Sequence, residues 1–397
     1  MTRAASSSRL RDEPREHVIG RYVGSEPGPL VLCVGGLHGN EPSGVDALGR
    51  VFGELSEART PFRGEAVGLA GNLPALADGR RFVDEDLNRI WTLDRIAALR
   101  RLSENGGAPP DAVEAREQRH LLALLESELR GSEDREVYLL DLHTTSSDSV
   151  PFLTFSDSLR NRSFAGSFPL PLVLGVEEEV EGTLLDFVDH MGHVAVCAEG
   201  GSHMDPASVD HLEAVVWLTL VSTGCVRLTD VPEADGLRER LSRAAGGVPQ
   251  VFEVRYRHGL RPGDDFRMKP GFRNFQEVDE GEILARDHRG AIGAPMAGRL
   301  FLPLYQEQGE EGFFLVREVA PFWLEVSAVL RRLRVDRLAR FLPGIRPHPD
   351  REETLVVHPR VASRFLVNVF HLLGYRRERP EDGRLVLSRR KDAVEDR

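Results

Sequence analysis

His38 and Glu41 are the first residues in the chain whose types and spacing could do chemistry. They follow an apolar run at residues 29–34, and the intervening Gly35 and Gly36 let the backbone turn sharply away from a buried strand. An imidazole and a carboxylate held together on such a turn suit a divalent ion, most naturally Zn²⁺. His-x-x-Glu is a weak pattern by itself, and a capping Glu beside an incidental loop His explains it equally well.

The same arrangement recurs twice along the chain. An apolar run at residues 136–143 ends in His143, and another at residues 193–199 ends in Glu199. Ligands of open α/β sheets bind at the carboxyl ends of the strands, so we expect these side chains to join the first pair at one edge. Two His and one carboxylate leave a coordination position open, as in catalytic zinc sites, and Glu199 is then a natural general base. Asp141 shares a strand face with His143 and could orient its imidazole.

A charged segment at residues 80–91 is a further candidate for the site. It carries Arg81, Asn88 and Arg89 among several apolar side chains. A loop that is pinned to the body, with Asn88 and Arg89 pointing at a ligand, would need such apolar anchors. Either arginine could then stabilise an oxyanion. Composition alone favours the plainer interpretation, an ordinary surface loop with salt bridges.

The elements that must position these residues alternate between strands and helices. Apolar runs typical of buried strands alternate with helical spacing at residues 44–55, 113–129, 184–191 and 206–223. This order predicts an α/β catalytic domain over residues 16–228, after a disordered tail at residues 1–15.

The sequence pattern changes after residue 226. Residues 231–248 are expected to form a linker, and short strands broken by Gly and Pro predict a smaller β-rich domain over residues 249–318. These strands are expected at residues 252–256, 271–275, 283–286, 300–304 and 312–316. Residues 319–397 are expected to form a C-terminal helix, at residues 322–342, and a small α+β extension. The extension should contain a helix at residues 361–373 and a hairpin that turns at residues 381–383.

Composition limits the classes of partner. The net charge of the 397 residues is −12, which makes nucleic acid a poor default ligand, and no apolar run is long enough to span a bilayer. The basic side chains between residues 376 and 391 are therefore expected to form a solvated face. Cys33 and Cys197 lie in apolar runs, which is typical of a reducing compartment, and the N-terminus lacks the apolar core of a signal peptide. We expect a soluble cytoplasmic protein that could form a homo-oligomer.

Five motifs in order resemble the succinylglutamate desuccinylase/aspartoacylase family of the zinc-carboxypeptidase-like superfamily. They are Gly35-Gly36-x-His38-Gly39-Asn40-Glu41-x-Ser43-Gly44, Asn72-x-Pro74-x-x-Ala77, Arg81-Phe82-x-x-x-Asp86-Leu87-Asn88-Arg89-x-Trp91, Asp141-Leu142-His143-Thr144 and Glu199-x-Gly201. The resemblance includes many motif residues over residues 15–225. From there to residue 318 it is limited to the general pattern of short strands. It implies a zinc-carboxypeptidase-like mixed sheet flanked by helices, followed by a domain that caps the substrate.

The resemblance also implies roles for individual residues. It implies that His38, Glu41 and His143 bind one Zn²⁺ per chain. Glu199 would then carry out the proton transfers, and Arg81 would bind the scissile carbonyl. The resulting activity is that of a zinc-dependent amidohydrolase acting on a small N-acyl amino acid.

Three more residues are implied on the substrate side. Asn88 and Arg89 would hold the free carboxylate of the substrate, because a planar guanidinium binds a carboxylate through two hydrogen bonds. Tyr305 resembles the tyrosine that the family's β-rich domain contributes.

The substrate itself stays open at this stage. Family members acting on acidic amino acids tend to carry a further Arg shortly before the catalytic Glu, and residues 184–190 contain none. We therefore expect an amino acid with a neutral or cationic side chain, near Asp186 or Asp189, as in N-acetyl-diaminobutyrate. The alternatives are a metallocarboxypeptidase acting on peptides and a metal-binding protein without turnover. An intact Glu199 argues against the latter.

Overall fold

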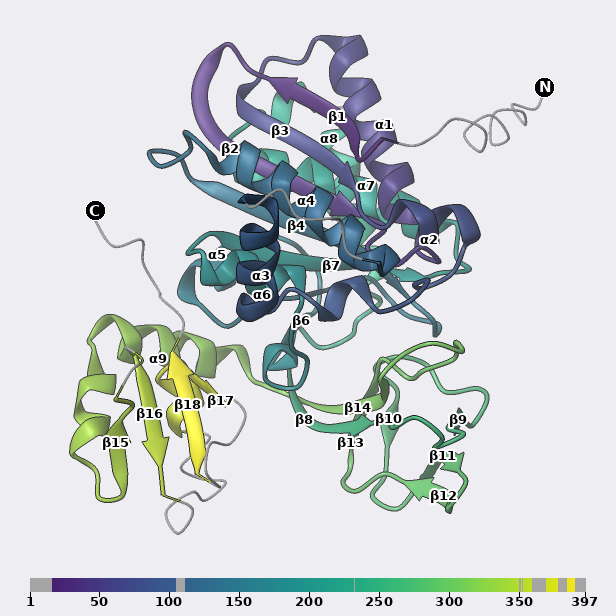
Figure 1. The fold of residues 1–397 in the computed structure, drawn as a ribbon, viewed down its shortest axis with the longest axis vertical. Helices are drawn as coiled ribbons and strands as arrows, with labels where there is room; N and C mark the ends of the chain where they lie inside the picture. Colours follow the sequence, from purple (N-terminus) through teal and green to yellow (C-terminus); the bar gives the residue numbers. More distant parts are fainter. Residues whose placement is uncertain are drawn as a thin grey trace.

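The strands that carry the candidate site lie side by side in one mixed sheet (Figure 1). The computed structural model describes residues 16–104, 111–231, 233–349, 351, 353–358, 369–377 and 384–389. Strands β3 (Arg63–Ala70), β2 (Glu26–Gly35), β4 (Val137–Thr145) and β7 (Val194–Ser202) are parallel neighbours in that order. Their carboxyl ends therefore meet at one edge of the sheet, as the sequence predicted.

The same sheet continues into the part of the chain that was expected to form a separate β-rich domain. Its order among the described residues is β1-β3-β2-β4-β7-β5-β6-β8-β14-β13-β10. The further strands are β1 (Val18–Val23), β5 (Phe152–Thr154), β6 (Leu172–Leu174), β8 (Val251–Gly259), β14 (Glu311–Glu318), β13 (Gly298–Phe301) and β10 (Glu277–Val278). Parallel pairing of β6 with β8 joins the two regions through backbone hydrogen bonds. The division into domains stays a prediction.

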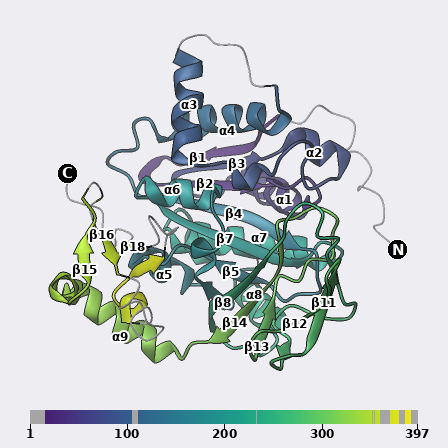
Figure 2. The same ribbon diagram turned by 60° about the horizontal axis from the view of Figure 1, so that its bottom comes forward.

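Helices cover both faces of the parallel strands (Figure 2). Leu30, Leu32 and Val34 of β2 face one layer of helices, whereas Val31 and Cys33 face the other, because successive side chains of a strand alternate. The first layer contains α3 (Leu93–Glu104), α4 (Val113–Leu129) and α6 (Leu184–His190). The second contains α1 (Ser43–Ala58), α5 (Leu159–Ala165), α7 (Ala207–Ser222) and α8 (Ala234–Ala244).

Three expectations about local structure are wrong. The linker expected at residues 231–248 contains α8, which buries Leu237 and Leu241 against the sheet's second helical layer. Two apolar residues in a polar helix gave too little periodic signal. The strand expected at residues 271–275 is irregular, since Phe275 has a left-handed φ of 63°. The helix expected at residues 322–342 ends early, as α9 (Pro321–Arg332), and a short 3₁₀ helix, η4 (Val335–Phe341), follows it.

The remaining elements build two small sheets and several turns. β9 (Arg267–Met268), β11 (Ile283–Asp287) and β12 (Gly290–Gly293) form one small sheet, and β15 (Ile345–Pro347), β16 (Thr354–Val357), β18 (Leu385–Arg389) and β17 (Tyr375–Arg377) form the other. The short helices are α2 (Leu73–Asp78), η1 (Leu87–Arg89), η2 (Val176–Glu178) and η3 (Leu228–Asp230). Most of the helix expected at residues 361–373, and the turn at 381–383, lie outside the described residues.

The expected solvated face near the C-terminus is wrong for Arg376. This residue is 4% exposed and forms ion pairs with Asp157, Glu178 and Glu253. Its partners come from distant segments, so local charge density could not reveal them. In the part of the chain that the structure describes, no helix is both long enough and apolar enough to cross a membrane.

Candidate active site

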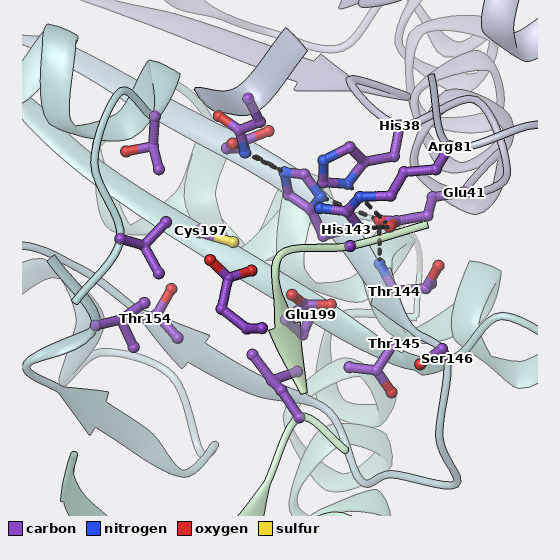
Figure 3. A pocket seen from close by; sticks show the side chains of 18 of the residues that line it. His38, Glu41, Arg81, His143, Thr144, Thr145, Ser146, Thr154, Cys197 and Glu199 are labelled. Atoms are coloured by element: carbon purple, nitrogen blue, oxygen red, sulfur yellow. Dashed lines mark hydrogen bonds and ion pairs between the residues drawn. The ribbon is translucent and has the colours of Figure 1, made fainter. Parts of the chain in front are cut away.

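His38, Glu41 and His143 come together at the carboxyl ends of β2 and β4 (Figure 3). Glu41 lies between the two imidazoles: Oε1 is 3.0 Å from Nδ1 of His38, and Oε2 is 3.0 Å from Nδ1 of His143. The backbone N–H of Thr144 also donates to Oε2 at 3.0 Å. Among the described groups of three side chains that could hold a metal ion, this one alone is fully buried. The three side chains thus converge on one point, as the sequence predicted.

Two further carboxylates hold the outer nitrogens of these imidazoles. Nε2 of His38 is 3.1 Å from Oδ1 of Asp86, and Nε2 of His143 is 2.9 Å from Oδ2 of Asp141. A protonated Nδ1 of either ring donates to the Glu41 carboxylate, whereas a ring with its hydrogen on Nε2 alone has a lone pair on Nδ1 for a cation that Glu41 can also bind. Carboxylate–histidine pairs of this kind orient the ligands of metal ions. The donor set therefore fits a divalent ion such as zinc, to which two imidazoles and one carboxylate can bind.

The charges of the cluster depend on one another. Burial by itself would raise the pKa of Glu41, but His38 and His143 outweigh it and hold that pKa well below its usual value. Burial would lower the pKa of His143, but Asp141 and Glu41 raise it well above its usual value. The pocket therefore favours positive charge between these carboxylates, which protons or a metal ion can supply.

Glu199 extends from β7 into the same cleft, opposite His143 in the strand register. Its Oε2 atom is buried and has no hydrogen-bond partner. Burial raises the pKa of Glu199 well above its usual value; Glu41 and Asp141 add to this effect, and His143 opposes it. A cation bound by the neighbouring residues would lower this pKa again, because a nearby positive charge favours the carboxylate form.

The charged segment at residues 80–91 is pinned to the body of the protein and is not the plain surface loop that its composition favoured. The fully buried carboxylate of Glu114, on α4, accepts hydrogen bonds from the backbone N–H groups of Val83, Asp84 and Glu85 at 2.7–3.2 Å. Three such bonds fix the course of the backbone. The segment therefore presents its following residues to the cleft in a defined geometry.

Arg81 and Asn88 reach the metal-binding residues from this segment. Arg81 donates from Nε to Oδ2 of Asp86 at 2.9 Å, and its Nη1 lies 3.8 Å from Oε1 of Glu41. Asn88 Nδ2 is 3.4 Å from Nε2 of His143, and its Oδ1 accepts from the backbone N–H of Leu184 at 2.9 Å. Both residues line the cleft, so the structure brings them to the site.

Arg89 also lines the cleft, but a carboxylate of the protein already holds it. Its Nη2 donates to Oε2 of Glu311 at 2.9 Å, while Arg257 donates to the other oxygen at 3.0 Å. The Nε atom of Arg89 is buried without a partner. Its Nη1 donates to the backbone O of Asn88 at 2.8 Å, so Nε–H is the donor of this guanidinium that is left without a partner.

The structure does not bring Tyr305 to the cleft. Its hydroxyl donates to the backbone O of Lys269 at 2.8 Å and accepts from the backbone N–H of Phe272 at 3.1 Å. Its predicted role on the substrate side stays a prediction, and it would require these bonds to break. The neighbouring Pro303, Leu304 and Gln306 do line the cleft, whose volume is about 160 Å³.

Comparison with known proteins places this geometry in a family. The model of the succinylglutamate desuccinylase/aspartoacylase catalytic domain matches residues 27–219. Residues 27–219 belong to that family. The segment contains all the metal-binding candidates, Glu199 and the pinned loop, and the family is one of deacylases.

Relatives of the family share parts of the sequence and most of the fold. The succinylglutamate desuccinylase of Burkholderia lata is 32% identical over 62 residues, which are 16% of this chain and only 18% of that protein's length. A succinylglutamate desuccinylase/aspartoacylase structure from Rhodobacter sphaeroides has a TM-score of 0.56 at 19% identity, and the match covers 76% of this chain and 88% of that one. The product-bound ectoine utilization protein EutE (DoeB) of Ruegeria pomeroyi has a TM-score of 0.52 at 18% identity and 74% and 86% coverage. At these identities the structures show a common fold.

Sequence reasoning about this desuccinylase/aspartoacylase-like chain missed three carboxylates of the site. Asp86 lies within a recognised motif, between Arg81 and Asn88, and that position was the only local signal for it. Glu311 meets Arg89 across 222 residues, and no local pattern indicates this contact. Glu177 lines the cleft from η2, and the sequence predicted no role for it. Conversely, Asp186 and Asp189, which were expected near the substrate's side chain, are not among the residues that line the cleft.

Proposed function

We propose that the protein is a zinc-dependent hydrolase that cleaves the amide bond of a small N-acyl amino acid. The observation that carries this proposal is the buried His38–Glu41–His143 donor set beside the unpartnered carboxylate of Glu199. This arrangement joins three ligands for a metal ion to a proton acceptor in one cleft. It matches the chemistry of metal-assisted hydrolysis, in which a carboxylate acts as general base and then as general acid.

One Zn²⁺ per chain would be held by His38, Glu41 and His143, with Asp86 and Asp141 orienting the imidazoles. When bound, zinc would supply Lewis acidity and lower the pKa of water toward about 7. The donor types also accept other divalent ions, so the identity of the metal is part of the proposal.

The side chains around the ligands have complementary tasks in amide hydrolysis. Glu199 takes a proton from the attacking water and passes it to the leaving nitrogen as the C–N bond breaks. Arg81, fixed by Asp86, donates to the carbonyl oxygen as negative charge develops there. Asn88 and the unpartnered Nε–H of Arg89 hold the carboxylate of the substrate. The products are a carboxylic acid and an amino acid.

The size of the cleft supports a small substrate. Its volume of about 160 Å³ is well below the 300–1,000 Å³ of a typical pocket for a drug-sized ligand. Pro303 and Leu304, from the predicted capping region, form part of its wall. A wall at this position favours an N-acyl amino acid over a peptide chain that would extend beyond the cleft.

We further propose that the enzyme works in the cytoplasm. Its cysteines, Cys33, Cys197 and Cys225, are free thiols. Thiols that stay reduced are typical of that compartment.

Release of free amine from a panel of N-acyl amino acids and short peptides tests the proposed function. Wild-type protein and Glu199→Gln are each assayed after chelation and again after zinc is added back. We expect zinc-dependent release from N-acyl amino acids that Glu199→Gln lacks, although this variant still binds one zinc. Preferential release from peptides would support a metallocarboxypeptidase. Stoichiometric zinc without turnover on the whole panel would support a binding role and refute the proposal.

A further inference from the structure

Glu177 is a buried carboxylate in the cleft for which the proposed reaction has no use. It lies on η2, lines the cleft, and its side chain is 4% exposed. Oε1 accepts a hydrogen bond from the backbone N–H of Asp157 at 3.2 Å, while Oε2 is buried and has no partner. Burying a carboxylate oxygen without a partner is costly, because the group loses its hydration. Burial accordingly raises the pKa of Glu177 to about 7.

The cationic groups of the cleft are engaged with carboxylates other than Glu177. Its lining includes Arg81 and Arg89 and the imidazoles of His38 and His143, which pair with Glu41 and Asp141. Both guanidinium groups already form ion pairs, with Asp86 and Glu311 respectively. A divalent ion would be held by His38, Glu41 and His143, a group that does not include Glu177. The Oε2 atom of Glu177 would therefore still lack a hydrogen-bond donor.

The C-terminal extension holds the turn that carries Glu177. Arg376, on β17, donates from Nη1 to Oε1 of Glu178 and to Oε1 of Glu253, both at 3.1 Å, and from Nε to Oδ2 of Asp157 at 3.2 Å. Its Nε is 3.9 Å from Oε1 of Glu177. Arg376 therefore shares its charge among several carboxylates and fixes the turn, but it does not reach the free oxygen of Glu177.

We propose that Glu177 forms a subsite for a cationic group on the amino-acid part of the substrate, and that Arg376 of the C-terminal extension positions it. An ammonium group at this subsite would supply the hydrogen-bond donor and the charge that Oε2 lacks. This inference rests on the proposed function and assigns its specificity. It replaces Asp186 and Asp189 as the acidic residues that meet the side chain of the substrate.

The first test compares substrates of matched length with the zinc-loaded, full-length protein. The N-acetyl derivative of diaminobutyrate is compared with that of norvaline, and the derivative of ornithine with that of norleucine, by kcat/KM. The N-acetyl derivatives of lysine and aspartate complete the panel. A charge-assisted hydrogen bond in a buried site should favour the best cationic substrate over its apolar analogue by about 10- to 100-fold. Equal kcat/KM values, or a preference for the aspartate derivative, would overturn the proposal.

Variants assign the preference to residues. Glu177→Gln keeps the shape of the side chain, and we expect it to abolish the preference while turnover of the apolar analogue persists. Glu181→Gln, a change at an exposed position on the same segment, is the matched control and should keep the preference. Arg376→Met should raise KM for the cationic substrate with little change in kcat, and Arg376→Lys should restore part of the loss. If Glu177→Gln retains the wild-type preference, the subsite is refuted even if the Arg376 variants fail to fold.

Binding of the free amino acids makes the test independent of turnover. Calorimetric titration with ornithine and norleucine should show tighter binding of ornithine to the wild type and equal binding to Glu177→Gln. If the protein hydrolyses no N-acyl amino acid, the proposed function fails, and these titrations still decide the subsite. If it hydrolyses the apolar substrates and binds both amino acids equally, the function stands and the subsite is refuted.

Discussion

Asp86 joins the metal-binding residues to the pinned loop, and Asp86→Asn should uncouple them. One oxygen faces Nε2 of His38 at 3.1 Å and accepts from the backbone N–H of Asn88 at 2.9 Å, while the other accepts from Arg81 at 2.9 Å. Burial would raise the pKa of Asp86, but Arg81 and His38 outweigh it and hold that pKa well below its usual value. The carboxylate is therefore charged at neutral pH. Asparagine keeps its size but removes the charge and places N–H donors opposite Arg81 or His38.

Two magnitudes follow from these contacts. Loss of the carboxylate behind a histidine ligand typically lowers metal affinity about 10- to 100-fold, or roughly 1.4–2.7 kcal/mol. Arg81 is 11% exposed and would lose its close ion-pair partner, and breaking a buried pair costs about 3–5 kcal/mol of stability. We therefore expect weaker zinc binding together with a lower free energy of unfolding.

Competition with a chromophoric chelator measures the zinc affinity of the folded protein, and urea unfolding measures its stability. Glu85→Gln is the matched control, because Glu85 lies on the same loop as Asp86 but pairs with Arg95 of α3, and both of these side chains are 31% exposed. It should leave zinc affinity unchanged. If folded Asp86→Asn binds zinc as tightly as the wild type, Asp86 does not orient His38, and the interpretation of the donor set is refuted.

Three further perturbations test other parts of the site. Glu199→Gln should lower kcat by about 10²- to 10⁴-fold with bound zinc unchanged, measured by amine release and metal analysis; retained activity would exclude Glu199 as the base. The pKa of Glu177 is raised in the folded protein from its ordinary 4.5 to about 7, so its contribution to stability is complete below pH 4.5 and is lost as pH rises to about 7. Glu177→Gln should thus become more stable relative to wild type by up to about 3 kcal/mol between pH 4.5 and 8 in urea unfolding, and a constant difference would contradict the burial argument. Gly39→Ala should destabilise the protein by roughly 3 kcal/mol or more, because the Cβ of the new alanine would lie 2.0 Å from the backbone carbonyl carbon of Ala75. A midpoint of urea unfolding equal to that of the wild type would refute this contact.

The polar residues at the ends of β2, β4 and β7 were predictable because strand periodicity is local. Each apolar run identifies a buried strand, and parallel pairing brings the carboxyl ends of such strands to one edge. His143 and Glu199 accordingly occupy paired positions in the register. The α/β fold and the meeting of His38, Glu41 and His143 followed from this pattern and from the motifs that resemble the family.

The weaker expectations failed where the local signal was poor or misleading. Helix α8 was missed because it buries few apolar residues, of which Leu237 and Leu241 are the most deeply packed. Residues 80–91 read as a surface loop because the carboxylate that pins them, Glu114, lies on a helix farther along the chain. A pattern of charges does not show which charges will be partners.

The sequence by itself determined which residues could bind a metal and at which ends of the strands they stand. Only the tertiary structure decided which carboxylates surround the site: Glu311 meets Arg89 across 222 residues, and Asp157 meets Arg376 across 219. The physical reason is that strand and helix periodicity depends on neighbours along the chain, whereas the pairing of buried charges depends on which distant segments pack together. The structure also shows that Oε2 of Glu177 has no partner, because Arg376 of the C-terminal extension pairs with Glu178 and Glu253 instead.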